Sequence, residues 1–124
     1  MKKILKILRN RFMRTSGNNI NYNDMQKMLR ENKNIIVIDV RTKDEFSNNH
    51  LKDAKNLPLQ DICESKMNQL VRNKSNIIIV YCEYGGRSQK ACIKMKRMGY
   101  DNVYNLEGGQ SRLILPNPTW FCCS

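Results

Sequence analysis

Two nearly unbroken apolar runs dominate the pattern of hydrophobic and polar positions along the chain. They are IIVIDV, Ile35 to Val40, and NIIIVY, Asn76 to Tyr81. Neither shows the apolar–polar alternation of a strand with one wet face, so both predict strands covered on two sides, as in a parallel sheet. Another strand is expected at NVYNL, Asn102 to Leu106, and a short extended piece at AKNLPL, 54–59, where Pro58 excludes a central ladder position.

Helix signals fall between these runs. Capping-box patterns, in which a polar residue precedes Glu or Gln by three positions, open three predicted helices: Asn23 with Gln26, Thr42 with Glu45, and Asp61 with Glu64. The first is expected to reach about Asn32 and the third about Asn73. A fourth helix, Ser88 to Met98, should stop at Gly99. Strands that alternate with helices predict an α/β fold with a mostly parallel central sheet.

The basic charge is concentrated at the start of the chain. The sequence holds 22 Lys and Arg against 11 Asp and Glu, a net charge of +11, and residues 1–14 contain six of these cations and no acid. Apolar residues at helical spacing lie between them, so residues 1–14 are either an amphipathic leader that makes peripheral contact with an anionic membrane or a partner, or a basic leader that packs loosely. The remaining chain has no groove of interleaved basic and aromatic residues, so nucleic acid is not a predicted partner.

Three segments are expected: a basic leader and linker (1–19), one domain (20–115) and a C-terminal tail (116–124). No run of about 18 apolar residues occurs, so no membrane span is predicted. The five cysteines form no pairing pattern, which favours free thiols and a cytoplasmic location. With one histidine and no CxxC pair, neither a metal nor another cofactor is expected.

The candidate chemistry lies in VYCEYGGRSQ, Val80 to Gln89, where a cysteine ends a predicted strand. Ligand sites in α/β sheets gather beyond the carboxyl ends of strands. Gly85 and Gly86 allow a tight bend, Arg87 adds a cation, and the helix predicted from Ser88 directs its positive dipole end at the loop. These features favour a thiolate at Cys82 and therefore a nucleophile.

The other cysteines are interpreted differently. Cys92 is expected to be a small core residue and Cys63 to be incidental. Cys122 and Cys123 either relay a sulfur species or lie in an untethered tail. A cysteine phosphatase has five residues between its cysteine and arginine, whereas four separate Cys82 from Arg87, which favours sulfur over a bulky phosphoryl group.

An ordered series of motifs resembles a single-domain rhodanese, a sulfurtransferase. The series spans residues 20–109 and consists of IDVR (38–41), EF (45–46), HLKDAKNLPL (50–59), YCEYGGRS (81–88) and GYDNVYNLEGG (99–109). The resemblance implies the three-layer rhodanese fold, with about five mostly parallel strands and helices on both faces. It also implies that Cys82 carries sulfur, that the amides of Glu83, Tyr84, Gly85, Gly86, Arg87 and Ser88 hold the persulfide, and that Arg87 faces an anionic donor. Asp39 and Arg41, which share one strand face, and His50 are expected to be structural.

The sequence departs from the family pattern at three places. Asn49 replaces a common Gly before the histidine. QSRLILPNP follows Gly108 and Gly109, with Trp120 much later, so the final helix should be shortened or displaced. Glu83 places a negative charge in the loop, which disfavours a free dianionic donor and suggests a protein-bound persulfide.

The expected function is sulfur transfer by a ping-pong cycle, from thiosulfate or a persulfide donor through Cys82 to cyanide, a thiol or a partner protein. The alternative from another class is a non-enzymatic rhodanese-like binding or regulatory module. A cysteine phosphatase is a third hypothesis.

Overall fold

A computed structural model of the 124-residue chain describes residues 18–113 and 121–122. The predicted leader at residues 1–14, Cys123 and most of the predicted tail lie outside the described residues.

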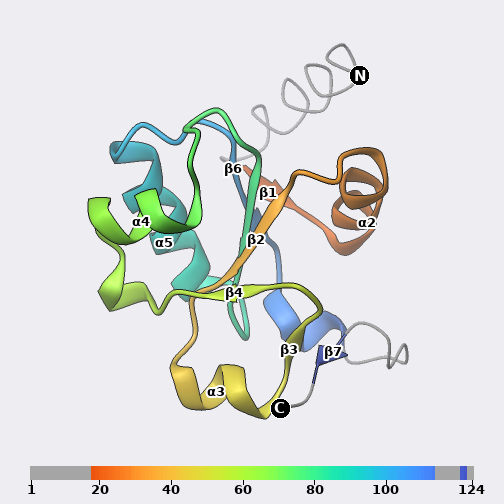
Figure 1. Ribbon diagram of the computed structural model, residues 1–124. Helices are drawn as coiled ribbons and strands as arrows, with labels where there is room; N and C mark the ends of the chain where they lie inside the picture. Colours follow the sequence, from red (N-terminus) through yellow and green to blue (C-terminus); the bar gives the residue numbers. More distant parts are fainter. Residues whose placement is uncertain (1–17, 114–120, 123–124) are drawn as a thin grey trace.

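A five-stranded sheet forms the centre of the described molecule (Figure 1). All neighbouring strands run parallel, in the order β1 (Asn19–Ile20), β6 (Val103–Leu106), β5 (Ile78–Tyr81), β2 (Ile36–Asp39) and β4 (Lys55–Asn56). The two apolar runs therefore form the adjacent strands β2 and β5, near the middle of the sheet. β4 lies at an edge, in agreement with the limit that Pro58 sets.

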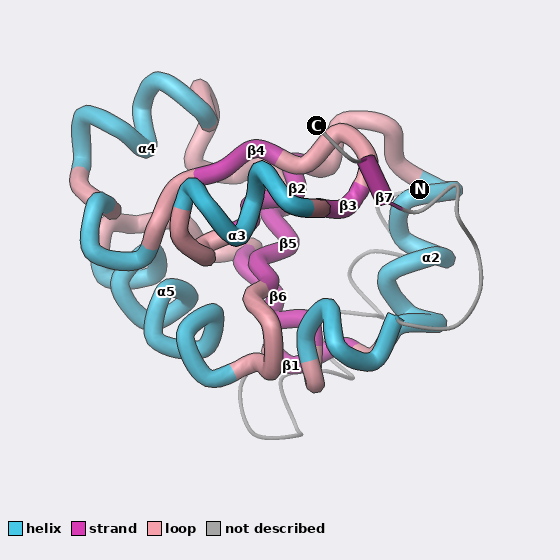
Figure 2. The backbone as a smooth tube through the Cα atoms, turned by 90° about the horizontal axis from the view of Figure 1, so that it is seen from below, coloured by secondary structure: helices cyan, strands magenta, loops and turns pink. Residues whose placement is uncertain are grey.

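Helices cover both faces of this sheet (Figure 2). α2 (Tyr22–Glu31) lies on one face, and α4 (Glu64–Leu70) and α5 (Gly86–Arg97) lie on the other. A short helix, α3 (Lys43–Asn48), and two 3₁₀ turns, η1 (Leu59–Asp61) and η2 (Gly109–Leu113), complete the connections. The predicted three-layer α/β architecture is confirmed.

The apolar runs bury alternate side chains on opposite faces. Ile79 and Tyr81 belong to the cluster that includes Met25 and Met28 of α2. Ile78 and Val80 belong instead to the cluster that includes Met67 of α4 and Met95 of α5. Every residue of β5 is buried because both of its faces are covered, which explains the missing polar alternation.

Only one of the three predicted capping boxes stands where it was placed. Thr42 and Glu45 open α3. The box of α2 uses Asn21, whose side chain accepts from the Asp24 amide at 2.8 Å, so α2 begins before the predicted Asn23.

The other two helix starts also differ from the prediction. Asp61 is still in the η1 turn, where its amide bonds Pro58 O at 2.8 Å, so Cys63 becomes the N-cap of α4. α4 ends at Leu70 instead of about Asn73. α5 begins at Gly86, two residues before the predicted Ser88.

Both ends of the described chain are tied to the fold. Asn18 and Asn19, expected in a linker, belong to the sheet: Asn19 is in β1, and Asn18 O accepts from the Asn105 amide at 2.8 Å. In the segment expected to be a tail, β7 (Phe121–Cys122) pairs antiparallel with β3 (His50–Leu51). An untethered tail is therefore wrong for those two residues. After β6 the described chain continues as the η2 turn, and residues 114–120, on which the predicted shortening or displacement of the final helix depends, lie outside the described residues.

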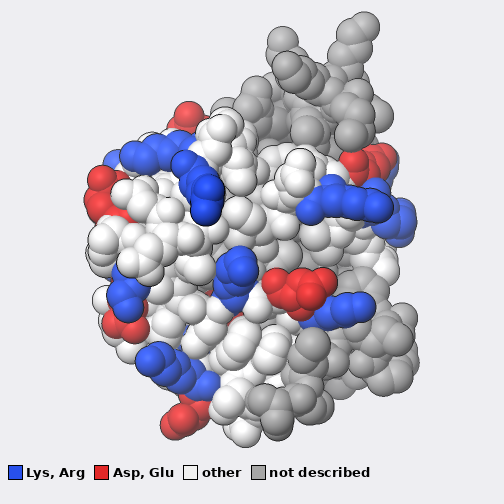
Figure 3. Space-filling model, viewed as in Figure 1, with Lys and Arg blue, Asp and Glu red and all other residues white. Residues whose placement is uncertain are grey.

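The described surface mixes charges of both signs. On the face shown in Figure 3, Lys and Arg side chains are interspersed with Asp and Glu side chains and form no continuous basic tract. No helix among residues 18–113 is long and apolar enough to cross a membrane.

Candidate active site

The candidate site lies at the edge of the sheet where the parallel strands end. β2 and β5 pair in parallel, with Asp39 opposite Tyr81, so the residues that follow each strand come together. Cys82 follows β5, and Arg41 and α3 follow β2. α3 lies below the sheet in Figure 1, beside β3 and β7.

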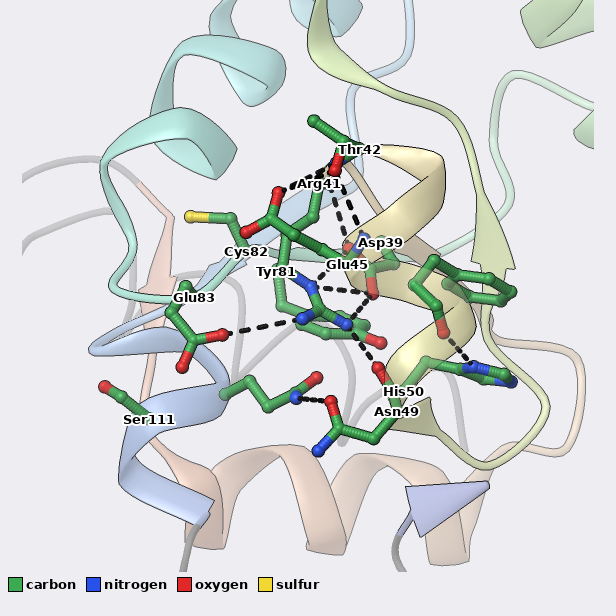
Figure 4. A network of polar contacts seen from close by, with 12 residues as sticks. Asp39, Arg41, Thr42, Glu45, Asn49, His50, Tyr81, Cys82, Glu83 and Ser111 are labelled. Atoms are coloured by element: carbon green, nitrogen blue, oxygen red, sulfur yellow. Dashed lines mark hydrogen bonds and ion pairs between the residues drawn. The ribbon is translucent and has the colours of Figure 1, made fainter. Parts of the chain in front are cut away.

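Cys82 lies at the floor of a loop that leads into α5. Its exposed fraction is 1%, and its Sγ accepts hydrogen bonds from the amides of Gly85 at 3.1 Å and Ser88 at 3.3 Å. The Ser88 amide is the third N–H of α5 and has no partner inside a helix, so the sulfur satisfies a donor that the helix leaves unpaired. The Cys82 sulfur points toward the start of α5 (Figure 4). Amides and a positive helix end both stabilise negative charge on this sulfur.

The Ser88 side chain completes the contacts of the sulfur. The Cys82 thiol donates to Ser88 Oγ at 3.4 Å, and Ser88 Oγ bonds the carbonyl of Gly85 at 3.1 Å and the Asn105 side chain. Ser88 is fully buried. Its hydroxyl therefore ties the loop to β6 as well as to the cysteine.

The turn that begins at Gly108 and Gly109, after β6, is hydrogen-bonded to the loop that follows Cys82. The amides of Gln110 and Ser111 donate to the carbonyls of Cys82 at 2.8 Å and Glu83 at 2.9 Å. Both carbonyls are thereby hydrogen-bonded to the η2 turn. Gly109, at φ +63°, packs so closely that a Cβ there would clash with the Cys82 carbonyl oxygen. The sequence contains Gly108 and Gly109 as a motif, but their contact with the Cys82 loop was not predicted.

Arg87 is held by an ion pair with α3. Its Nη1 and Nη2 donate to the two oxygens of Glu45 at 2.7 and 2.9 Å. The hydrogen bond from Arg87 is the main cause that lowers the pKa of Glu45, from 4.5 to about 2. Arg87 was expected to face an anionic donor, whereas the described guanidinium joins α5 to the capping box of α3.

A second arginine, Arg41, joins the other charged groups of the site. It is buried, donates to the Asp39 carboxylate at 2.7–3.0 Å and bonds Asn49 O at 2.6 Å. Its Nη1 also lies 3.5 Å from Glu83 Oε1. Arg41 thus lies between Asp39 and Glu83 (Figure 4), and this contact accounts for the carboxylate in the loop that the sequence left unexplained.

The remaining loop residues differ in exposure. Tyr84 is 76% exposed, the largest exposure of a large hydrophobic side chain among the described residues. Gly86 is the first residue of α5, and a Cβ there would meet no atom within 4 Å. Gly85 has φ +107°, and its Cβ would lie 3.3 Å from the amide nitrogen of Gly108.

Residues predicted to be structural or incidental have the following surroundings. Cys92 is buried in α5, where burial raises the pKa of its thiol to about 12. Cys63 is exposed, and a hydrogen bond with the Ser65 side chain lowers the pKa of its thiol. The His50 ring stacks on Phe46 at 3.7 Å and its Nδ1 lies 2.8 Å from Phe46 O. Within residues 18–113, no group of three or more His, Cys, Asp or Glu could hold a metal ion.

Three comparisons relate this geometry to known proteins. A sulfurtransferase of Allochromatium vinosum is 28% identical over 92 residues, 74% of this chain and 83% of that protein. A tRNA uridine(34) hydroxylase of Buchnera aphidicola is 34% identical over 96 residues, 75% of this chain but only 30% of that longer protein. A solved structure described as a rhodanese with anions from E. coli has a TM-score of 0.62 and 28% identity, and the match covers 73% of this chain and 99% of that one.

The sequence also matches a model built for a whole protein family. The model of the rhodanese-like domain covers residues 21–113, which include every strand of the central sheet except the short β1, and the whole loop after Cys82. Because that match spans most of the chain, the protein belongs to the rhodanese-like domain family, which includes sulfurtransferases.

Proposed function

We propose that this protein carries sulfane sulfur on Cys82, taking it from thiosulfate or a persulfide and giving it to cyanide, a thiol or a partner protein. The observation that carries the proposal is the pair of amides, Gly85 N and Ser88 N, that point at Sγ from 3.1 and 3.3 Å. Such donors stabilise an anionic sulfur as nucleophile and later as persulfide.

The chemistry proceeds in two displacement steps. The Cys82 thiolate forms a bond to the outer sulfur of thiosulfate, the sulfur–sulfur bond of the donor breaks, and sulfite leaves with the electron pair. An acceptor such as cyanide then attacks the outer sulfur of the persulfide, and the Cys82 thiolate leaves as thiocyanate forms. Neither step needs an external oxidant or reductant.

The loop residues have complementary tasks in this proposal. Gly85 and Ser88 bind the cysteine sulfur, and the amides of Glu83, Tyr84, Gly86 and Arg87 are available for the second sulfur of the persulfide. Asp39 and Arg41 support the loop from β2. A phosphatase is less well supported, because only four residues separate Cys82 from Arg87 and the Arg87 guanidinium is bonded to Glu45.

Intact-mass measurement tests the proposal directly. We expect thiosulfate or a persulfide donor to add the mass of one sulfur atom, and cyanide to remove it as thiocyanate. The protein carries Cys63→Ser throughout, because Cys63 is exposed and its pKa is lowered. Adding Cys82→Ser should abolish the adduct, whereas the control Cys92→Ser should keep it. An adduct that persists without Cys82 contradicts the proposal.

The same measurement addresses the alternative of a binding or regulatory module. No adduct with either donor class, in a protein whose circular dichroism shows that it is folded, supports that module. The cytoplasmic location and a peripheral membrane contact through residues 1–14 stay predictions.

A further inference from the structure

The charged groups around Cys82 are already paired with one another. Both Nη atoms of Arg87 are bonded to Glu45. Arg41 is bonded to Asp39 and to the Asn49 carbonyl, and its exposed side-chain fraction is only 3%. The Arg41 guanidinium is therefore closed to solvent, and the Arg87 guanidinium, although its side chain is 40% exposed, is already neutralised by the Glu45 carboxylate.

The balance of these charges is negative. Two arginines face three carboxylates, those of Asp39, Glu45 and Glu83, and the reactive thiolate adds one more negative charge. The Glu83 side chain is 32% exposed and belongs to the residue directly after Cys82, so it lies on the solvent side of this network. A dianion that approaches the sulfur therefore meets the Glu83 carboxylate, while the Arg41 and Arg87 guanidiniums are already bonded to carboxylates.

We infer that Glu83, held by Arg41, selects as sulfur donor a thiol-borne persulfide without a second negative charge beside its outer sulfur, and discriminates against thiosulfate. This inference rests on the proposed function. The cysteine persulfide group fits the requirement whether it is on a small molecule or in a polypeptide, since the atoms next to its two sulfurs are uncharged.

The transfer from such a donor balances without a co-reactant. The Cys82 thiolate bonds to the outer sulfur of R–S–SH, the bond between the two donor sulfurs breaks, and R–S⁻ leaves with the electron pair. The proton stays on the transferred sulfur. The leaving R–S⁻ therefore carries the one negative charge that the Cys82 thiolate had before the reaction.

The test compares two donors in the full chain. The rate of Cys82 sulfur loading is measured with thiosulfate and with the persulfide of N-acetylcysteine amide, whose carrier is uncharged. Glu83→Gln should raise kcat/KM for thiosulfate about tenfold, since one repulsive charge near a dianion is removed, and change the persulfide value less than about twofold. Glutamine keeps an oxygen that can accept from Arg41. The matched control is Asp101→Asn, which removes an exposed carboxylate before β6, at the opposite end of that strand from the site, and should change neither value.

Added salt supplies a second readout. Wild-type loading by thiosulfate should speed up as ionic strength rises, because salt screens the repulsion, and Glu83→Gln should flatten that dependence. An unchanged ratio of the two donors in Glu83→Gln overturns the inference, and so does an equal loss with both, which would make Glu83 only a positioning residue. If wild type accepts sulfur from neither donor, the proposed function fails and the inference fails with it.

A further arm identifies the source of the persulfide. Tyr84, 76% exposed beside Glu83, is the contact available to a polypeptide carrier. If the carrier is a polypeptide, Tyr84→Ala should slow loading from a blocked persulfide-bearing peptide several-fold more than loading from the small persulfide. If the ratio of the two rates stays at its wild-type value, the same donor chemistry comes from a small molecule.

Discussion

Two adjacent glycines in the Cys82 loop, Gly85 and Gly86, have different structural roles. Gly85 has φ +107° and donates its amide to Cys82 Sγ, whereas Gly86 is an ordinary first residue of α5 with open space at its Cβ position. Placing a side chain at a positive φ lowers the free energy of unfolding by about 1–2 kcal/mol. Replacing a glycine inside a helix by alanine raises that free energy by up to about 1 kcal/mol.

Substituting each glycine separates these tasks. Gly85→Ala should lower the free energy of unfolding by about 1–2 kcal/mol and slow sulfur loading, because the strained amide shifts relative to Sγ. Gly86→Ala should keep the loading rate and unfold at the same or a slightly higher urea concentration. Urea unfolding and the mass adduct measure both effects. Equal behaviour of the two variants would contradict the assigned geometry.

At the scale of elements, the η2 turn positions the loop that joins β5 to α5. Gly109→Ala places a Cβ against the Cys82 carbonyl oxygen and 2.6 Å from that of Glu83, both of them backbone atoms that cannot swing aside. We expect a loss of about 2–4 kcal/mol in the free energy of unfolding and a loss of sulfur loading, even where the protein remains folded.

A remote glycine provides the control for this prediction. Gly99 also has a positive φ, +99°, but its Cβ would meet only the flexible side chain of Lys74, at 3.3 Å. Gly99→Ala should destabilise the protein by about 1 kcal/mol and load sulfur at the wild-type rate. If Gly109→Ala loads sulfur normally, the turn does not position the loop.

The elements also show what the sequence could predict. Local sequence patterns predict the buried strands β2 and β5 and the Thr42–Glu45 capping box. A strand buried on both faces and a helix cap can each be recognised from a few consecutive residues. The start of α2 was missed because Asn21 and Asn23 compete as caps, and the start of α4 was missed because Asp61 belongs to the η1 turn and Cys63 is the N-cap. Pairings across the chain, such as Arg87 with Glu45 and Arg41 with Glu83, leave no local mark.

At the scale of the whole molecule, the Glu45–Arg87 pair joins α3, after β2, to α5, after β5. The pKa of Glu45 is lowered from 4.5 to about 2, so the folded state favours the charged carboxylate. A lowered carboxyl pKa contributes stability that is fully present above pH 4.5 and is lost as the pH falls toward 2. Both side chains are more than a third exposed, 40% for Arg87 and 34% for Glu45, so solvent screens the pair.

Acid unfolding of Glu45→Gln tests this link. Glutamine can still accept the Thr42 amide bond of the capping box, so the substitution removes mainly the charge. At pH 7 the variant should be less stable than wild type by up to about 1 kcal/mol. That difference should shrink below pH 4.5 and vanish near pH 2, where protonation makes the wild-type carboxyl neutral too.

Urea unfolding at a series of pH values measures the difference in stability. Asp101→Asn is the control, because the Asp101 side chain is exposed and joins none of the ion pairs found among the described residues, and it should match wild type throughout. A stability difference for Glu45→Gln that stays constant on acidification would show that the charge on Glu45 does not hold α3 to α5.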